Sequence, residues 1–302
     1  MELQTNLLPA RIRASVEHRD ARQVSIGRSG ARVWVYDDRV LKLERTSPAA
    51  DREYELLCWL DGRAGAPRVI DFEREGEYNC LLETRVPGVM TCDKDALQDP
   101  AAVTHALAQG LIALRDISVT ELLPSAAVAA DSANPAPSGS IRFDSRVAPL
   151  LAKTRERFKR GQIHHSDLSD ECLSSFLSMP TPRLRRDARG SSDFPSVNSV
   201  LSWLDRNRPS ETLAFVQGDY CLPNVFLHSG RFSGMIDFGR GGVADAGMDI
   251  ALCVRSMWYN FCFLGGMTKA EFMERRAQLF AELGLQPDEK RLRYYFYLDE
   301  LS

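Results

Sequence analysis

The sequence lacks the cysteine and histidine spacing of a metal-binding or disulfide-rich protein. Its seven cysteines are an odd number, contain no Cys-x-x-Cys pair and have no metal-site spacing relative to histidine. His164 and His165 are adjacent in the chain, whereas a histidine pair that binds zinc from one helical face stands four residues apart. Unpaired thiols of this kind are typical of the reducing cytosol. The sequence therefore predicts reduced thiols and a cytoplasmic protein.

Long apolar runs are also absent. No stretch approaches the roughly 18 apolar residues that a membrane-spanning helix needs. The chain begins MELQTNLLPARIRASV, with an acidic residue at position 2 and no long apolar segment of the kind found in secretory signal peptides. We therefore expect no membrane partner.

The sequence has no excess of positive charge. Its formal net charge is −3 and its pI is near 6.0, so its overall field does not attract nucleic acid or anionic lipid. The basic cluster RLRR at 183–186 has no interleaved aromatic residues, and we interpret it as a solvated loop rather than a nucleic-acid site. The 302 residues are 44% hydrophobic and 26% charged, which suffices for one large domain or two lobes.

The N-terminal part of the chain is rich in strand patterns. Residues 23–38 and 39–45 alternate β-branched and polar side chains across a turn at Asp37-Asp38, which predicts a hairpin. Residues 50–62 follow as a helix with Leu56, Leu57 and Leu60 on one face and a stop at Gly62. Two more strands are predicted within 68–88, with a turn at Glu75-Gly76.

From about Val103 the pattern becomes helical. Helical periodicity is found at 103–117, 197–207, 269–284 and 291–301. The sequence therefore predicts an α+β protein in which a small β lobe precedes a large helical lobe. The stretch 125–140 is small, polar and proline-rich, and we predict a flexible surface insertion there.

Polar residues interrupt two apolar runs in the C-terminal half. In GDYCLPN, Asp219 and Asn224 stand five residues apart, and Asp237 follows an apolar run in GMIDFGR. Burying an unpaired carboxylate costs several kcal/mol, so such residues are either paired internally or used. Two short strands would bring all three side chains to the edge of one cleft, where such groups hold magnesium on a nucleotide and accept a hydroxyl proton.

A lysine and a glycine-bearing turn in the strand-rich part complete this set. Lys42 lies in the strand pattern VLKLE, where its ammonium group needs a partner, and Glu53 on the following helix is the natural candidate. Upstream, IGRSGARV is a turn whose backbone N–H groups could cover phosphates. Each feature alone has another interpretation: a surface lysine, an ordinary hairpin turn, or an Asx-turn or cap at Asp219. The whole series in this order indicates a kinase.

The segment GDYCLPNVFL…GMIDFGRGGVADAGMDIALCVRS resembles the catalytic and metal-binding region of the aminoglycoside phosphotransferases, most closely the 3′-phosphotransferase (kanamycin kinase) group. The likeness extends to DREYELLCWLDG, LLETRVPG and the terminal YYFYLDEL, but not to 125–140 or 172–192. It implies a two-lobed, protein-kinase-like fold, with a nucleotide-binding lobe over 1–86 and a catalytic and substrate-binding lobe over 87–302.

The resemblance also implies roles for single residues. Asp219 becomes the catalytic residue that orients the attacking sugar hydroxyl, and Asn224 and Asp237 become Mg2+ ligands. Lys42, fixed by Glu53, would hold the α- and β-phosphates of ATP, with GTP as an alternative. The remaining nucleotide contacts would come from Ser29 in the glycine turn and from the backbone of Thr84 and Val86.

The acceptor site should be acidic, because an aminoglycoside carries several ammonium groups. The resemblance assigns it Asp167, Asp170 and Glu171, which have helical i, i+3, i+4 spacing, together with Asp299, Glu300 and the terminal carboxylate of Ser302. Alternatively, the first three acids form a solvated helix start and the last three a frayed chain end. Arg240 and Arg255 match arginines of the family motif and could brace either the site or the fold.

Three positions depart from the family pattern. Gln217 stands where the family usually has histidine, and we expect it to brace the loop by hydrogen bonding; Asp249 should support the same loop from a helix start. Tyr259 and Asn260 replace acids, which puts the substrate range in doubt.

We predict phosphate transfer from ATP or GTP to the 3′-hydroxyl of an aminoglycoside, by a monomer or weak dimer that confers antibiotic resistance. The rivals are a kinase of the same fold acting on another small molecule, and a non-catalytic binding module.

Overall fold

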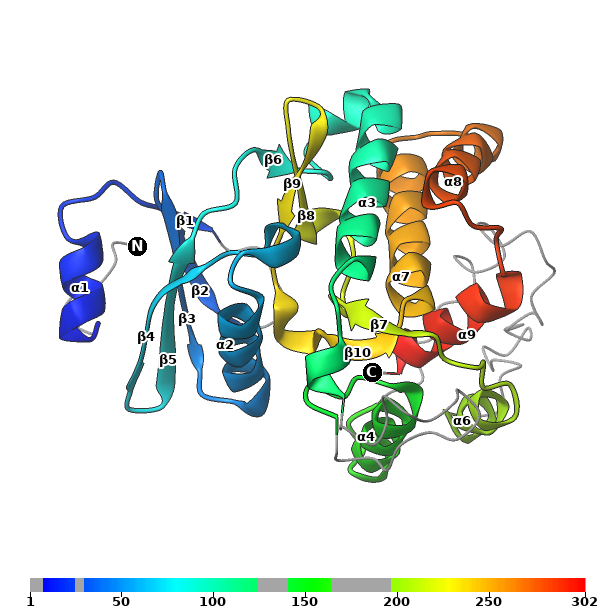
Figure 1. The fold of residues 1–302 in the computed structure, drawn as a ribbon, viewed down its shortest axis with the longest axis horizontal. Helices are drawn as coiled ribbons and strands as arrows, with labels where there is room; N and C mark the ends of the chain where they lie inside the picture. The colour runs from blue at the N-terminus through cyan, green and yellow to red at the C-terminus, as the bar shows by residue number, and fades with distance from the viewer. Residues whose placement is uncertain (1–7, 25–29, 124–140, 164–196, 302) are drawn as a thin grey trace, which may run out of the picture.

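The computed structural model describes residues 8–24, 30–123, 141–163 and 197–301 (Figure 1). Ser29, Asp167, Asp170, Glu171, Ser302 and the predicted insertion at 125–140 lie outside these residues, so their predicted roles stay predictions. Within them, no helix is both long enough and apolar enough to cross a membrane.

An antiparallel sheet forms the N-terminal part. The described strands are ordered β1-β2-β3-β5-β4, and α1 and α2 lie on its two sides (Figure 1). The bounds of these elements are α1 Ala10–Val16, β1 Arg22–Val24, β2 Arg32–Val35, β3 Arg39–Arg45, α2 Pro48–Leu60, β4 Val69–Glu75 and β5 Tyr78–Thr84.

The two faces of this sheet differ in chemistry. Leu41, Leu82 and Cys80 point to one face, where they are buried against α1 with Ile12 and Val16. Because side chains alternate along a strand, Lys42 and its cross-strand partner Leu81 belong to the opposite face. That face is turned toward α2 and the helical part of the chain (Figure 1).

Local sequence signals determine where the helix α2 begins and ends. Ser47 caps its start by accepting a hydrogen bond from the Ala50 N–H at 3.1 Å, and Pro48 occupies the first helical position, where a missing N–H costs nothing. It ends at Asp61, which adopts the left-handed conformation one residue before the predicted stop at Gly62. Its buried leucines are the predicted ones, Leu56, Leu57 and Leu60.

The C-terminal part is mainly helical. Helices α3, α7, α8 and α9 gather around a two-stranded sheet, β10-β7, and a three-stranded sheet, β6-β8-β9, next to the polar motifs (Figure 1). The bounds are β6 Val89–Met90, α3 Pro100–Arg115, α4 Val147–Lys159, α6 Val197–Arg206, β7 Leu213–Val216, β8 Val225–His228, β9 Arg231–Met235, β10 Gly242–Asp245, α7 Gly247–Trp258, α8 Lys269–Leu283 and α9 Glu289–Glu300. The predicted α+β fold, with strands first and helices after, is confirmed.

The two parts are joined beyond the chain connection between them. Arg52 on α2 donates hydrogen bonds to the carbonyl of Gly241 at 2.7 and 3.1 Å and to the Ser145 hydroxyl at 2.7 Å. Helix α2 also packs against the 3₁₀ turn Phe238–Arg240. These contacts place α2 directly against the loop that follows Asp237.

Candidate active site

Gln217 ties two loops together. Its side-chain amide nitrogen donates to the carbonyls of Ile236 and Asp237 at 2.8 and 2.7 Å, and its side-chain oxygen accepts from the Asp219 N–H at 2.7 Å. The side chain is buried, so these bonds are shielded from water. The expected bracing role of Gln217 is confirmed, and it connects the segment of Asp219 to that of Asp237.

Asp249 holds the backbone of the same loop by hydrogen bonds. It lies in the first turn of α7 and accepts hydrogen bonds from the backbone N–H groups of Gln217 at 2.6 Å and Gly218 at 2.9 Å. Burial raises the pKa of its carboxyl to about 7, against the lowering effect of the two N–H donors. Its expected structural role is confirmed.

Asp219 and Asn224 are held side by side. The Asn224 amide nitrogen donates to the Asp219 carbonyl at 2.9 Å and approaches its carboxylate at 3.4 Å. Pro223 sits in the 3₁₀ turn Leu222–Asn224 that sets this geometry. Burial raises the pKa of Asp219, while nearby Arg240 opposes the shift. A carboxylate with a raised pKa is a better proton acceptor, as general base catalysis requires.

Lys42 is held by carboxylates on the face of the sheet that is turned toward α2. Its ammonium nitrogen lies 2.5 Å from a Glu53 carboxylate oxygen and 3.3 Å from one of Glu44. Burial works against the charge, but Glu53, Asp237 and Glu44 hold the pKa of Lys42 above its ordinary value. The ammonium group is therefore permanently charged, as a phosphate ligand must be.

Asp237 is close enough to Lys42 and to Asp219 for its charge to act on both. It adopts the left-handed conformation with φ 63°, directly before the 3₁₀ turn Phe238–Arg240. Its charge influences the pKa values of both Lys42 and Asp219. Among the described residues no hydrogen bond or ion pair engages its carboxylate, which is left free for a ligand.

Asn224 and Asp237 fit a magnesium ion that is shared with phosphates. The described residues contain no group of three or more histidine, cysteine or acidic side chains that could hold a metal by themselves. Mg2+ is commonly bound through one or two protein oxygens, with substrate phosphates and water completing the shell. The Asn224 side-chain oxygen and the unpaired Asp237 carboxylate form such an incomplete set.

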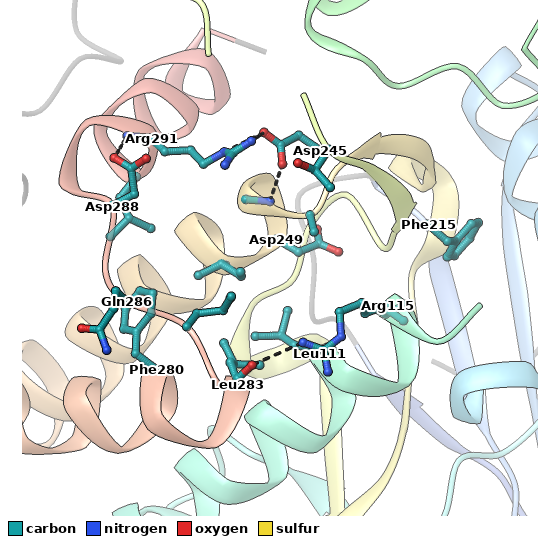
Figure 2. A pocket seen from close by; sticks show the side chains of 17 residues that line it. Leu111, Arg115, Phe215, Asp245, Asp249, Phe280, Leu283, Gln286, Asp288 and Arg291 are labelled. Atoms are coloured by element: carbon teal, nitrogen blue, oxygen red, sulfur yellow. Dashed lines mark hydrogen bonds and ion pairs between the residues drawn. The ribbon is translucent and has the colours of Figure 1, made fainter. Parts of the chain in front are cut away.

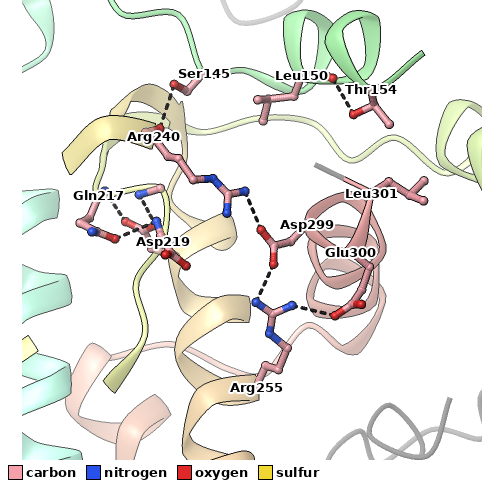
Figure 3. A network of polar contacts seen from close by, with 12 residues as sticks. Ser145, Leu150, Thr154, Gln217, Asp219, Arg240, Arg255, Asp299, Glu300 and Leu301 are labelled. Atoms are coloured by element: carbon pink, nitrogen blue, oxygen red, sulfur yellow. Dashed lines mark hydrogen bonds and ion pairs between the residues drawn. The ribbon is translucent and has the colours of Figure 1, made fainter. Parts of the chain in front are cut away.

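Arginines and acids form a network beside Asp219 (Figure 3). Arg240 donates to one carboxylate oxygen of Asp299 at 2.6 Å, and Arg255 lies 2.5 Å from the other. Arg255 also donates to Glu300 at 2.9 Å. Burial would raise the pKa of Asp299, but the two arginines lower it.

The chain matches the model of the phosphotransferase enzyme family over residues 20–295. An aminoglycoside 3′-phosphotransferase from Niallia circulans is 41% identical over 248 residues, covering 82% of this chain and 77% of that protein.

It is a phosphotransferase of the aminoglycoside kinase family.

Two solved structures confirm that the fold is shared. An aminoglycoside-3′-phosphotransferase of type VIII superimposes with a TM-score of 0.67 at 22% identity, covering 97% of each chain. The aminoglycoside phosphotransferase APH(3″)-Id from Streptomyces rimosus, in complex with ADP and streptomycin, gives a TM-score of 0.62 at 20% identity, covering 96% of this chain and 95% of that one.

The predicted base-binding segment of the phosphotransferase lies at the end of β5. The Thr84 N–H donates to the carbonyl of Arg68 at 2.9 Å and is therefore not available to a nucleotide. Val86 is buried, and no backbone hydrogen bond of the described residues uses its N–H or carbonyl. Val86 therefore has both backbone groups available to a base, whereas Thr84 has no available N–H.

The aminoglycoside kinase also contains a cavity of about 260 Å3 behind the catalytic loop (Figure 2). Its wall is mostly apolar, with leucines from α3, α8 and α9, and it includes Asp249 but not Asp219. Arg115 donates across it to the carbonyl of Leu283 at 3.3 Å. This cavity lies outside the set of predicted site residues.

Sequence reasoning missed two acids near Lys42 of the phosphotransferase. Glu44, two residues after Lys42 on β3, is the second carboxylate partner of the ammonium group. Glu83 on β5 is buried on the same face of the sheet. An acid within the apolar run LLE was the available signal for Glu83, because a buried strand seldom carries an unpaired carboxylate.

Proposed function

We propose that the enzyme transfers the γ-phosphate of ATP to the 3′-hydroxyl of an aminoglycoside and thereby confers resistance to such antibiotics. The observation that carries this proposal is that the charge of Asp237 acts on both Lys42 and Asp219, with Lys42 held by Glu53. The Niallia circulans relative is named as a 3′-phosphotransferase. Its higher identity to this chain supports the 3′ position over the 3″ position in the name of the Streptomyces rimosus protein. The free thiols of the described cysteines agree with action in the cytoplasm.

Each site residue has a separate task in this proposal. The Lys42 ammonium group would bind the nucleotide phosphates, and the oxygens of Asn224 and Asp237 would hold Mg2+, which neutralises phosphate charge when bound. Asp219 would orient the acceptor hydroxyl and accept its proton. The hydroxyl oxygen bonds to the γ-phosphorus, and the bond from that phosphorus to the bridging oxygen breaks, leaving ADP.

One observation favours a second candidate, a kinase of the same fold acting on a less charged acceptor. Both carboxylate oxygens of Asp299 are engaged by arginines, and Glu300 is paired with Arg255. One turn beyond Arg255, the rings of Tyr259 and Phe263 stack at 5.3 Å and are 46% and 73% exposed. Exposed aromatic rings of this kind can line a site for a largely apolar, uncharged acceptor.

Product analysis decides between these candidates. Kanamycin is incubated with ATP and Mg2+, and the product is examined by phosphorus and proton NMR. A phosphate on the 3′-hydroxyl is the expected result. Modification at another hydroxyl would correct the regiochemistry, whereas ADP release with only neutral acceptors, such as a macrolide, would refute the aminoglycoside assignment.

Replacing Gln217 by alanine should weaken the brace between the two loops. Three partly buried hydrogen bonds are lost, each worth about 1 kcal/mol, so we expect a stability loss of about 2–3 kcal/mol and at least a 10-fold lower kcat. Calorimetric unfolding and steady-state kinetics measure the two effects. Gln98→Ala, which removes an exposed glutamine, is the matched control. An unchanged kcat in Gln217→Ala would show that the brace is not needed.

A further inference from the structure

The cavity behind the catalytic loop has a buried apolar end and an exposed end (Figure 2). Leu111 on α3, Phe215 on β7 and Phe280 on α8 line it and are buried. Leu285 and Gln286, which follow α8, also line it but are exposed. A molecule can therefore reach the cavity from solvent and bury apolar surface in it, which is favourable.

The acids of the cavity wall already have partners. Asp249 and Asp288 each accept hydrogen bonds from two backbone N–H groups, Asp288 at the start of α9. The Asp245 carboxylate is paired with the guanidinium group of Arg291 at 2.8 Å. These acids therefore do not require a cationic ligand.

Arg115, at the end of α3, still has hydrogen-bond donors to offer. One of its N–H groups donates to the Leu283 carbonyl at 3.3 Å (Figure 2). A guanidinium group has five N–H donors, and within the described ranges no carboxylate forms an ion pair with this one. An anionic group beside Arg115 would gain charge-assisted hydrogen bonds there.

The volume of the cavity limits the size of a ligand. A cavity of about 150 Å3 lined by leucine, isoleucine and phenylalanine binds one benzene ring. The cavity of this enzyme has a volume of about 260 Å3 and a similar wall, so it has room for two fused rings. Phe215 and Phe280 can pair with aromatic rings, which adds to the gain from burial.

We infer that this cavity is a second binding site, for a two-ring aromatic carboxylate whose rings fill it and whose carboxylate binds Arg115. Neither Lys42 nor Asp219 lines the cavity, so the site is separate from the predicted catalytic residues. It goes beyond the proposed function and does not depend on which acceptor is phosphorylated.

The occupant of the cavity also stabilises the catalytic loop. It contacts Asp249, whose carboxylate holds the N–H groups of Gln217 and Gly218 just before Asp219. A ligand that fits the cavity in this conformation binds it more tightly than a conformation in which the loop has moved away. Binding therefore shifts the population toward the assembled loop.

Thermal unfolding with two probes of opposite charge tests the ligand class. 2-Naphthoate should raise the Tm of the wild type, with a half-maximal effect below about 1 mM, because a ligand of the folded state stabilises it by mass action. 2-Naphthylmethylamine has the same rings but an ammonium group, and we expect it to bind at least about 10-fold more weakly. No shift with naphthoate, or an equal shift with the amine, would overturn the inference.

Two variants show whether the probe binds in the cavity. Arg115→Gln should weaken naphthoate binding about 10-fold, in line with the loss of one charge-assisted hydrogen bond. Ile250→Trp, on a half-buried wall residue of α7, should fill the cavity and abolish binding. Arg231→Gln, on an exposed arginine at the start of β9, is the control. Wild-type affinity in Arg115→Gln would overturn the inference even if Ile250→Trp did not fold.

Nucleotide competition and hydrogen exchange test the position of the site and its link to the loop. Naphthoate should leave the affinity for AMP-PNP with Mg2+ unchanged, and it should slow hydrogen–deuterium exchange at the N–H groups of Gln217 and Gly218. Displacement of AMP-PNP would place the probe in the nucleotide site and refute a second site. Unchanged exchange would refute the link to the loop. If AMP-PNP did not bind at all, the proposed function would be refuted, while the shifts in Tm would still decide this inference.

Discussion

Replacing Asp219 by asparagine should lower phosphate transfer by about 10²–10⁴-fold, the range over which a positioned general base contributes. Asparagine has nearly the same shape and can keep the contact with the Asn224 amide, which lies 2.9 Å from the backbone carbonyl of residue 219. It cannot take up the hydroxyl proton. The loss should therefore appear in kcat, with little change in folding or in nucleotide affinity.

The measurement is steady-state kinetics with ATP and kanamycin, together with calorimetric binding of AMP-PNP and thermal unfolding. Asp116→Asn, on an exposed acid at the end of α3, is the matched control and should behave like the wild type. If Asp219→Asn kept most of the wild-type kcat, another group would have to be the proton acceptor.

Replacing Asp299 by alanine should destabilise the fold by about 3 kcal/mol, the lower end of the cost of removing one partner from a buried ion pair. The Asp299 side chain is 10% exposed and is shared by Arg240 and Arg255, which are 45% and 24% exposed. Because Arg240 is partly exposed, water can still solvate its charge when Asp299 is removed. The loss in free energy of unfolding is therefore expected at the lower end of the range for buried ion pairs. Transfer activity should also fall, since Arg240 lies in the electrostatic field of Asp219.

Chemical denaturation of Asp299→Ala and Asp299→Asn measures this effect. Asp205→Ala is the control, because it breaks an exposed pair with Arg155 in which both side chains are 42% exposed, and it should cost under about 1 kcal/mol. An Asp299→Ala loss no larger than that of the control would contradict the prediction.

At acidic pH, the difference in free energy of unfolding between Asp299→Ala and the wild type should disappear. The two arginines lower the pKa of Asp299 in the folded state, so its stabilising effect is fully present above the unfolded-state value of roughly 3.9. As the pH falls through the lower, folded-state value, the carboxylate is protonated and that stability is lost. The stability gap between the two proteins should therefore shrink below about pH 4.

Local patterns were enough for most of the secondary structure and for the order of the motifs, but not for the helices α1 and α4. Strand alternation placed Lys42, and a serine cap, a proline and the leucine spacing placed α2 with Glu53. Their contact at 2.5 Å follows from the short connection between strand and helix. The polar residues Asp219, Asn224 and Asp237 stood out because each interrupts an apolar run.

Contacts between distant segments could not be predicted in this way. The pairing of Arg240 with Asp299 joins positions 59 residues apart, and no local pattern shows that the expected drug-binding acid already has a cationic partner. The orientation of Glu83 depends on the register of β5 against β3, which a shift by one residue would reverse. Such features come from the packing of the whole chain.

The hydrogen bonds of Arg52, which hold α2 against the C-terminal part, affect how this enzyme can be regulated. In protein kinases, the position of the corresponding helix controls activity. Here the guanidinium group of Arg52, one residue before Glu53, is bound to the Gly241 carbonyl and to Ser145 across the two parts of the molecule. With the helix anchored at this point, we expect a constitutively assembled catalyst that is always ready to act and needs no activating signal.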